Sequence, residues 1–237
     1  MRAFALLLML FSVTARAAEP VDVVLVLVAD VSRSIDDAEF QMQKKGYAAA
    51  FNDPRVLTAI RSGAIGAIAV AYVEFAGRYE VCTILNWHVV RDASSARAFT
   101  EAIIAANRSF YGGTSVSAGI DRAMQLLSRH PFEASRQVID VAADGINTSG
   151  RNVSTARDEA VAAGVTVNGL AIIDKPPAST LQVQVQPVES LTEWFRRRVI
   201  GGPGAFVIEV HEFAAFGEAM TRKLVSEIAS LPEPVRR

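Results

Sequence analysis

Small oxygen-bearing side chains are concentrated in three short segments that lie far apart in the sequence. The first holds Asp30, Ser32 and Ser34 in the pattern Asp-x-Ser-x-Ser, the second is Thr114 after a glycine pair, and the third is Asp144 before a glycine. Two carboxylates and three hydroxyls, without imidazole or thiolate, form a ligand set that suits a hard divalent cation. These residue types therefore predict a site for Mg²⁺, with Mn²⁺ or Ca²⁺ as alternatives.

The balance of charge in this set also predicts what the metal would do. Because the three hydroxyls are neutral, the two carboxylates balance a divalent cation and leave its attraction for one further anion. Each segment alone has an ordinary explanation, since Asp-x-Ser-x-Ser often caps a helix, and Gly-Gly-Thr and Asp-Gly are common in turns. Only the three segments together, correctly placed, favour a metal site with an open position for a carboxylate of a partner.

The elements that position these segments follow from the hydrophobic pattern. Apolar and β-branched runs predict strands at residues 21–29, 64–75, 137–143, 166–173 and 205–210, and 79–85 is the expected hairpin partner of the second. Helices are predicted at residues 35–51, 55–61, 94–106, 115–128, 154–163, 191–199 and 213–229. This alternation predicts an α/β domain with a mostly parallel six-stranded sheet and one antiparallel edge strand.

The order of the strands decides whether the three segments can meet. In an open doubly wound sheet, ligands bind outside the carboxyl ends of the strands where the strand order reverses. If the six strands, numbered along the chain, take the order 3-2-1-4-5-6, the first and fourth strands are neighbours at that reversal. Asp30 and Asp144 then face each other, and the separated segments become one site.

On these residues the sequence resembles the von Willebrand factor type A (VWA) domains. The run from Asp30 to Ser34, Thr114 within its Gly-Gly-Thr-Ser segment, and the Asp144-Gly145 pair are similar to the metal-ion-dependent adhesion site (MIDAS) of that family. The resemblance covers roughly residues 21–229. It implies a Rossmann-like doubly wound sheet with helices on both faces, and a metal whose open position takes an acidic residue from a protein partner.

Residue by residue, the resemblance implies that Ser32, Ser34 and Thr114 bind the metal through their hydroxyls. Asp30 and Asp144 would act directly or through water. More loosely, the chain is similar to an exported bacterial branch of the family. It departs from the family pattern in residues 176–204, which form a longer and more polar segment than a plain crossover.

Further residues are candidates for the rim of the site or for supporting it from behind: Gly113, Ser115, Asp140, Gly145 and Asn147. Ser115 and Ser117 are expected to cap the following helix. Asp140 lies four residues before Asp144 in an apolar strand, on the same side of the pleat. Because an unpaired buried carboxylate is costly, Asp140 either supports the site or pairs with a neighbour such as Arg136.

The N-terminus has the form of a secretory signal peptide. It contains Arg2, an apolar run over residues 3–13 and the small-residue end Ala15-Arg16-Ala17. The run is shorter than the roughly 20 apolar residues that span a bilayer. We therefore expect residues 1–17 to be removed, leaving one domain at 18–237 in the periplasm or extracellular space, with no transmembrane segment after cleavage.

Composition excludes several other classes of function. A formal net charge of −1 provides no strong basic field, so nucleic acid is not an expected partner. The single cysteine, Cys82, excludes an internal disulfide and a cysteine-based zinc site. The three histidines lie far apart in the sequence and show no zinc-site spacing.

The predicted function is an exported, non-catalytic binding module that coordinates a divalent cation and through it binds an acidic group of a protein partner. The alternative is a metal-dependent hydrolase of phosphate esters, in which the same cation polarises the substrate. That alternative needs a general base or nucleophile, and the sequence offers no convincing one. A third possibility is a scaffold that no longer binds metal, against which the complete set of five side chains counts.

Overall fold

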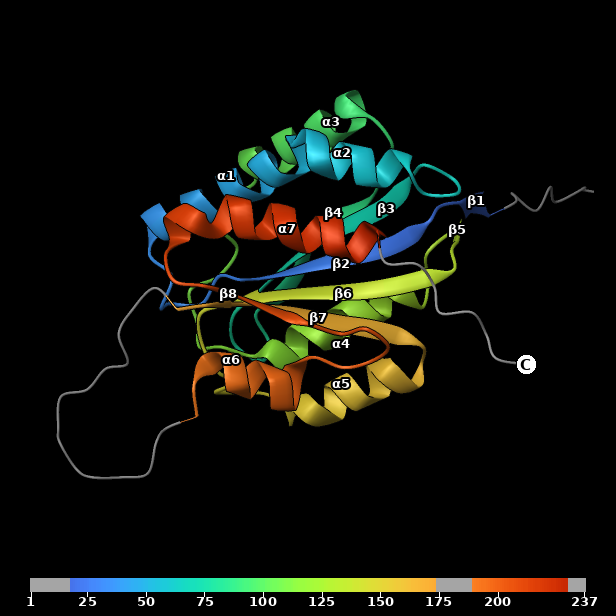
Figure 1. Cartoon of the computed structure of the whole chain (residues 1–237). Coiled ribbons are helices and arrows are strands. Elements are labelled where there is room, and N and C mark those ends of the chain that lie inside the picture. Colours follow the sequence, from blue (N-terminus) through green and yellow to red (C-terminus); the bar gives the residue numbers. More distant parts are fainter. Residues whose placement is uncertain (1–17, 174–188, 230–237) are drawn as a thin grey trace, which may run out of the picture.

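The protein is built on a six-stranded sheet between two layers of helices (Figure 1). The computed structural model describes residues 18–173 and 189–229. The strands are β2 (Val23–Asp30), β3 (Ile68–Phe75), β4 (Val81–Val90), β6 (Arg136–Ala143), β7 (Val165–Ile172) and β8 (Val207–Val210). Their order is β4-β3-β2-β6-β7-β8, and every neighbouring pair is parallel except β3 and β4. The predicted fold class, with its antiparallel edge strand, is confirmed.

The central strand β2 is apolar on both faces because both faces are covered. All eight of its residues are buried. Leu25 and Leu27 pack with the helices of one layer, and Val24 and Val26 pack with those of the other. A continuous β-branched run is the expected sequence for such a strand. The strand therefore fixes the position of its last residue, Asp30, at the carboxyl edge of the sheet.

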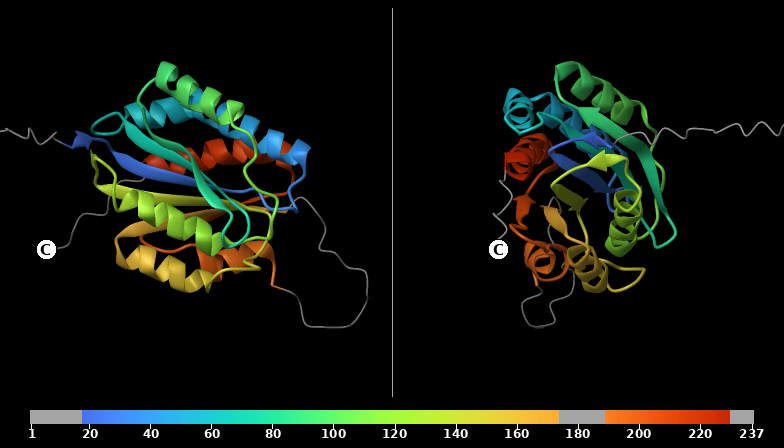
Figure 2. Two further views of the ribbon diagram at one scale, coloured as in Figure 1. Left: turned by 180° about the vertical axis from the view of Figure 1, so that it is seen from behind. Right: turned by 90° about the vertical axis from the view of Figure 1, so that its right-hand side faces the viewer.

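Two groups of helices cover the two faces, as Figures 1 and 2 show. One face is covered by α1 (Asp37–Asn52), α2 (Pro54–Arg61), α3 (Ala93–Ala105) and α7 (Phe216–Ala229), which is preceded by the short 3₁₀ turn η2 (Phe213–Ala215). The other is covered by α4 (Val116–Leu127), α5 (Val153–Ala162) and α6 (Leu191–Trp194), which continues into the π-helical turn η1 (Phe195–Val199). The two-residue strands β1 (Glu19–Pro20) and β5 (Phe132–Glu133) pair in parallel beside this core.

Two strand boundaries differ from the sequence prediction for identifiable reasons. β3 begins at Ile68 instead of residue 64, because the backbone N–H groups of Ile65, Gly66 and Ala67 donate to the carboxylate of Asp22 and hold this stretch in a loop. β4 extends to Val90, well past the predicted end at residue 85, and is irregular where it pairs with β3. A bulge interrupts the regular alternation, so the pattern of residues 86–90 did not indicate a strand.

Some predictions concern residues outside the described ranges. The proposed signal peptide, residues 1–17, is among them, as is most of the first half of the polar segment 176–204. From residue 189 onward that segment forms α6, η1 and a loop that leads into β8. Among the described helices, none is both long and apolar enough to cross a bilayer.

Candidate metal centre

The three predicted segments meet at the carboxyl edge of the sheet. Asp30 ends β2, and Asp144 directly follows the neighbouring strand β6. Ser34 Oγ donates to Asp144 Oδ1 at 2.7 Å, and the hydroxyls of Ser32 and Ser34 lie 3.1 Å apart. Thr114 Oγ1 donates to Ser32 Oγ at 3.2 Å. The structure thus brings together four of the five side chains in one hydrogen-bonded chain.

Asp30 joins this group as its most buried member. Its side chain is fully buried, and Oδ1 accepts a hydrogen bond of 2.8 Å from the backbone N–H of Ser32. Oδ2 is also buried and has no hydrogen-bond partner among the described residues. A buried carboxylate oxygen without a partner is costly unless a cation satisfies it. The orphaned oxygen and the oxygen-only surroundings fit a hard divalent cation.

The electrostatic surroundings of Asp30 point in the same direction. Burial, and after it the negative charge of Asp144, raise the pKa of Asp30 from 3.8 to about 7. The hydrogen bonds from Ser32 and, after them, the positive charge of Arg108 oppose this rise. Desolvation and a like charge both disfavour the ionised form. A bound cation would remove both penalties by balancing the two carboxylates.

The centre uses only two carboxylates. Within residues 18–173 and 189–229, no group of three or more His, Cys, Asp or Glu side chains is placed to hold a metal ion. A cation at this edge would therefore depend on the hydroxyls of Ser32, Ser34 and Thr114 as well as on Asp30 and Asp144. The site differs in this respect from zinc centres, which are built from imidazole, thiolate and carboxylate groups.

The loop that carries Asp30, Ser32 and Ser34 is fixed by hydrogen bonds to the end of β3, to the loop at Gly112 and to a side chain of α1. Val31 N donates to Phe75 O at the end of β3, at 2.8 Å, and Arg33 N donates to Gly112 O at 3.0 Å. Gln43 Nε2, from α1, donates to Asp30 O at 3.3 Å. Both serine hydroxyls are therefore presented by a braced loop.

Arg108, from a different segment of the chain, supports this loop and was not predicted from the sequence. Its side chain is only 5% exposed. The guanidinium donates to the carbonyl oxygens of Val31, Ser32 and Ile35, each at 2.8 Å, and lies 3.2 Å from Asp37 Oδ1. It also stacks over the ring of Tyr111, 4.2 Å from its centroid. Nothing in the local sequence distinguishes Arg108 from a solvated loop arginine, so only the fold reveals its role.

Thr114 is held by the loop that follows Asp144. Thr148 Oγ1 accepts from Thr114 N at 3.0 Å and donates to Thr114 O at 3.1 Å, while Thr148 N donates to the same carbonyl at 2.8 Å. Of Gly112, Gly113 and Gly145, only Gly112 is tightly packed. A Cβ there would collide with the Glu80 carboxylate, whereas one on Gly113 or Gly145 would make an ordinary contact with Thr148 Oγ1 or Thr114 Oγ1.

Two expectations about supporting residues are corrected by the contacts of Asn147. Ser115 occupies the N-cap position of α4 but its side chain makes no capping hydrogen bond, and Ser117 lies inside the helix, with the two hydroxyls 3.3 Å apart. Instead, Asn147 Oδ1 accepts from Ser117 N at 3.0 Å. Asn147 also donates to Ser149 O at 2.8 Å. It therefore caps α4 from a neighbouring loop, behind Thr114.

Asp140 does not contact the five side chains. It lies about 13 Å along β6 from Asp144, taking roughly 3.3 Å per residue. Its Oδ1 is 2.7 Å from Lys223 Nζ of α7, and both side chains are fully buried. Lys223 also pairs with Glu227, whose Oε1 accepts from Asn168 Nδ2 at 2.8 Å. Asp140 is therefore paired, which was one of the two alternatives, but its partner is Lys223 and not the suggested Arg136, which donates to the carbonyl oxygen of Glu227 at 2.6 Å.

Comparison with known proteins identifies the family and the fold. The family model described as "Protein of unknown function (DUF1194)" matches residues 20–232. A search of curated proteins found no match. Solved structures with the same fold include the von Willebrand factor type A protein from Catenulispora acidiphila, with a TM-score of 0.61 and 15% identity over 88% of this chain and 43% of that one.

Two further structures are similar in the same way. The pilus adhesin SpaC from Lactobacillus rhamnosus GG has a TM-score of 0.59 and 15% identity, over 90% of this chain and 31% of that one. Proximal thread matrix protein 1 from the mussel byssus, with a zinc-occupied MIDAS motif, has a TM-score of 0.56 and 17% identity, over 89% and 46%. The chain spans less than half the length of each of these three proteins. The likeness confirms the VWA fold.

Proposed function

Because the chain belongs to the family described as "Protein of unknown function (DUF1194)" and has the fold of VWA domains, we propose a function from its own residues. It is a binding module that holds a divalent cation at Asp30, Ser32, Ser34, Thr114 and Asp144. Through that cation it binds a carboxylate of an acidic residue on a protein partner.

The observation that carries this proposal is the state of Asp30. Its Oδ2 is buried and has no partner among the described residues, and the half-buried Asp144 adds a second negative charge nearby. A buried carboxylate oxygen such as Asp30 Oδ2 is unfavourable in a folded protein unless a cation satisfies it. The three hydroxyls linked to them add neutral oxygen ligands without adding charge.

Different elements of the fold hold the five proposed ligands in place. Asp30 is held at the strand end by β2, while Ser32 and Ser34 are held by a loop braced by Arg108. Thr148 orients Thr114. The cation, when bound, would supply a positive charge at the surface for the partner's carboxylate. Ser34 is exposed and Asp144 half-buried, so an acidic side chain can approach from solvent.

We propose Mg²⁺ as the natural cation because all five donors are oxygens and Mg²⁺ prefers such ligands. The zinc-occupied MIDAS motif of the mussel protein supports a divalent ion at this position of the fold. We also propose a non-catalytic role, in line with the adhesin and the matrix protein among the similar structures. Export through the signal peptide at residues 1–17 is part of the same proposal.

Isothermal titration of the purified chain with Mg²⁺ and Mn²⁺ tests the metal site. We expect one ion per chain, and a loss of affinity of about 100-fold or more in Asp30→Asn and in Asp144→Asn, because each removes a charged ligand. Asp158→Asn is the matched control, since Asp158 is exposed and pairs only with Arg157 among the described residues. Absence of metal-dependent heat in the wild-type chain would overturn the proposal.

The role of the cation in partner binding has a separate test. A panel of short peptides that contain one Asp or Glu, each paired with its Asn or Gln counterpart, is titrated into the metal-loaded chain. We expect binding to be restricted to acidic peptides and to be lost with a chelator. Chromogenic phosphate esters are tested in parallel, and turnover that disappears in Asp144→Asn would favour the hydrolase instead.

A further inference from the structure

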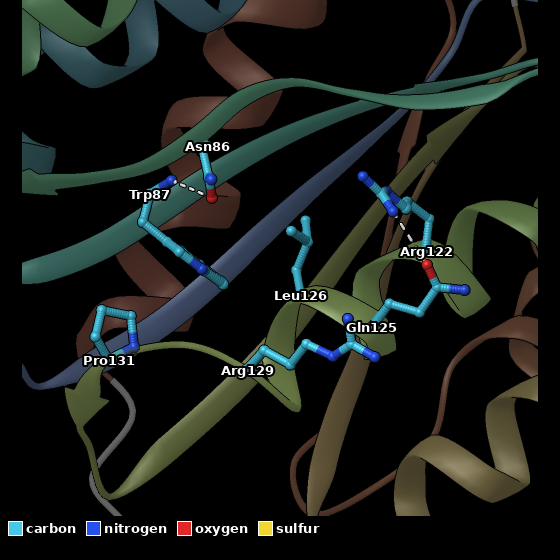
Figure 3. Close-up of a pocket in the computed structure, with 7 residues that line it drawn as sticks. All are labelled: Asn86, Trp87, Arg122, Gln125, Leu126, Arg129 and Pro131. Carbon is cyan, nitrogen blue, oxygen red and sulfur yellow. Dashed lines mark hydrogen bonds between the residues drawn. The ribbon is translucent and has the colours of Figure 1, made fainter.

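A second cavity, of about 580 Å³, lies between β4 and α4 at a distance from the metal centre (Figure 3). It is bordered by the second half of β4, by the C-terminal half of α4, and by Pro131 after that helix. α4 begins beside Thr114 and runs away from the metal edge, and the antiparallel strand β4 likewise begins near that edge. The cavity is therefore separate from the proposed metal site.

A bulge in the edge strand builds one wall of this cavity. Tyr72 of β3 pairs with Leu85 and Val70 pairs with His88, so Asn86 and Trp87 together oppose a single residue. Such a bulge redirects the side chains that it carries. The Trp87 ring is held in edge-to-face contact with His130 and Phe132, with ring centroids 6.0 and 5.8 Å away. The indole is thus a fixed aromatic surface.

Two arginines, Arg122 in α4 and Arg129 in the turn after that helix, supply the charge of the cavity. Arg122 donates from Nε to Thr83 Oγ1 at 2.9 Å and from Nη1 to Gln125 Oε1 at 3.1 Å, and both partners are neutral. Arg129 lies in the turn that follows the end of α4 and also lines the cavity. No carboxylate of the described residues lies within 4.0 Å of either guanidinium.

The one carboxylate of α4 does not neutralise Arg122 or Arg129, because it pairs with an arginine outside the cavity. Asp121, the residue before Arg122, pairs at 2.6 Å with Arg151, which also pairs with Glu159. The available carboxylate is thus turned away from the cavity. Hydrogen bonds to neutral groups hold the Arg122 guanidinium in place and leave its charge for another partner.

The cavity has a charged side and an aromatic side. In Figure 3 the guanidinium groups of Arg122 and Arg129 lie on one side of Leu126, and the rings of Trp87 and Pro131 lie on the other. Guanidinium groups bind carboxylates and phosphates in a fixed geometry, and an indole face favours flat unsaturated groups. We propose that this cavity is a second ligand site, which takes a small organic acid with its acid group between the arginines and a flat apolar body against Trp87.

The site is tested by NMR titration of the ¹⁵N-labelled chain with 2-naphthoate, which has the proposed chemistry. The indole N–H signal of Trp87, one of two tryptophans, reports occupancy and is assigned with Trp87→Phe. We expect a saturable shift with 2-naphthoate. The uncharged 2-naphthamide and the ringless acetate should each bind at least about tenfold more weakly, because each lacks one half of the contact.

Matched variants decide whether the arginines are responsible. Arg122→Gln and Arg129→Gln should each weaken binding of 2-naphthoate by about fivefold or more, whereas Arg97→Gln in α3, on the opposite face, should leave it unchanged. The titrations are repeated with a chelator in Asp144→Asn, so that binding through a metal is removed. Equal shifts with naphthoate and naphthamide, or retention of binding in both arginine variants, would overturn the proposal.

Discussion

Two pairs of carboxylates, at the metal centre and beneath α7, differ in how their charge is balanced. Asp140 and Glu227 are fully buried, and Lys223 Nζ lies between them. Asp30 is equally buried and Asp144 is half-buried, but they interact with hydroxyls and a backbone N–H. Lys223 thus contacts both members of the first pair, whereas Asp30 accepts a hydrogen bond from a backbone N–H and Asp144 accepts one from the hydroxyl of Ser34.

The comparison shows that a raised pKa does not by itself identify a functional carboxylate. Burial, and after it a neighbouring aspartate, raise the pKa to about 7 both for Asp30 and for Glu227. Beneath α7, although burial lowers the pKa of Lys223, the attraction of Asp140 and Glu227 raises it overall. The positive charge of Lys223 is therefore retained beside both carboxylates, although Asp140 Oδ1 and Oδ2 and Glu227 Oε2 accept no hydrogen bond from the described residues. At Asp30 we propose that a bound divalent cation supplies the balancing charge.

The largest expected effect is the loss of the internal cation. Lys223→Met leaves Asp140 and Glu227 buried without a positive charge, and breaking a buried ion pair in this way costs about 3–5 kcal/mol of unfolding free energy. Urea denaturation measures this, with exposed Lys45→Met as the control, for which we expect a change within about 0.5 kcal/mol. Mn²⁺ affinity at the metal centre should stay as in the wild type. A stable Lys223→Met would show that the cluster does not need its lysine.

In contrast to Lys223→Met, Asp30→Asn should lower the affinity for Mn²⁺ without lowering the unfolding free energy. We expect Mn²⁺ affinity to fall by about 100-fold, or about 2.7 kcal/mol, because a buried charged ligand is lost. The unfolding free energy of the metal-free chain should not decrease, since the substitution removes a buried charge that has no internal cation. Titration calorimetry and urea denaturation with a chelator measure the two quantities. If Asp30→Asn unfolds as readily as Lys223→Met, the two carboxylate pairs do not differ as we argue.

The pH dependence of metal affinity should also distinguish the metal centre from the cluster of Asp140, Lys223 and Glu227. Because metal binding requires the ionised form of Asp30, whose pKa is raised to about 7, affinity for Mn²⁺ should fall about tenfold per pH unit below that value. Titrations between pH 8 and pH 5 measure this slope. Lys223→Met should retain it, and Asp30→Asn should lose it. A flat profile in the wild-type chain would mean that Asp30 does not bind the metal.

The metal-free chain should show the reverse trend in stability. The pKa of Asp30 is higher in the folded state than its ordinary value of 3.8, so the folded state binds more protons between pH 4 and pH 7. The contribution of Asp30 to the unfolding free energy is therefore present at pH 4 and is lost as the pH rises through 7. Excess Mn²⁺ should remove this loss. Comparison of Asp30→Asn with the wild type isolates the contribution from that of Glu227.

The strand order and the five clustered side chains could be predicted from the sequence because local patterns determine them. The apolar run before Asp30 and the run before Asp144 each indicate a buried strand, and the reversal rule places the two strand ends side by side. Thr114 follows from its glycine pair at the start of a helix. In each case the informative residues are adjacent in sequence to the residue that they position.

The partners of Asp140 and the role of Arg108 could not be predicted, because they depend on contacts between distant segments. Asp140 meets Lys223 only when α7 packs across the sheet, and a lysine in a helix is ordinarily read as exposed. Arg108 reaches the loop of Val31 and Ser32 from an irregular segment without a motif. Asn147 was expected at the rim of the site or behind it, and its capping of α4 could not be predicted because it requires the exact position of Ser117 N.

The smallest expected effect concerns Arg108 and its contribution to the proposed metal centre. Its guanidinium donates to the carbonyl oxygens of the metal loop and pairs with Asp37, so it does not neutralise Asp30 as Lys223 neutralises Asp140. Its main role is therefore to shape the loop.

Arg108→Lys keeps the charge and loses the fork of donors, so Mn²⁺ affinity should fall by about fivefold, or about 1 kcal/mol. Arg151→Lys, at an exposed ion-pair site, is the control and should bind Mn²⁺ as the wild type does. If Arg108→Lys also binds Mn²⁺ normally, the charge of Arg108 matters at this centre and its geometry does not, and the contrast between the two carboxylate pairs becomes weaker.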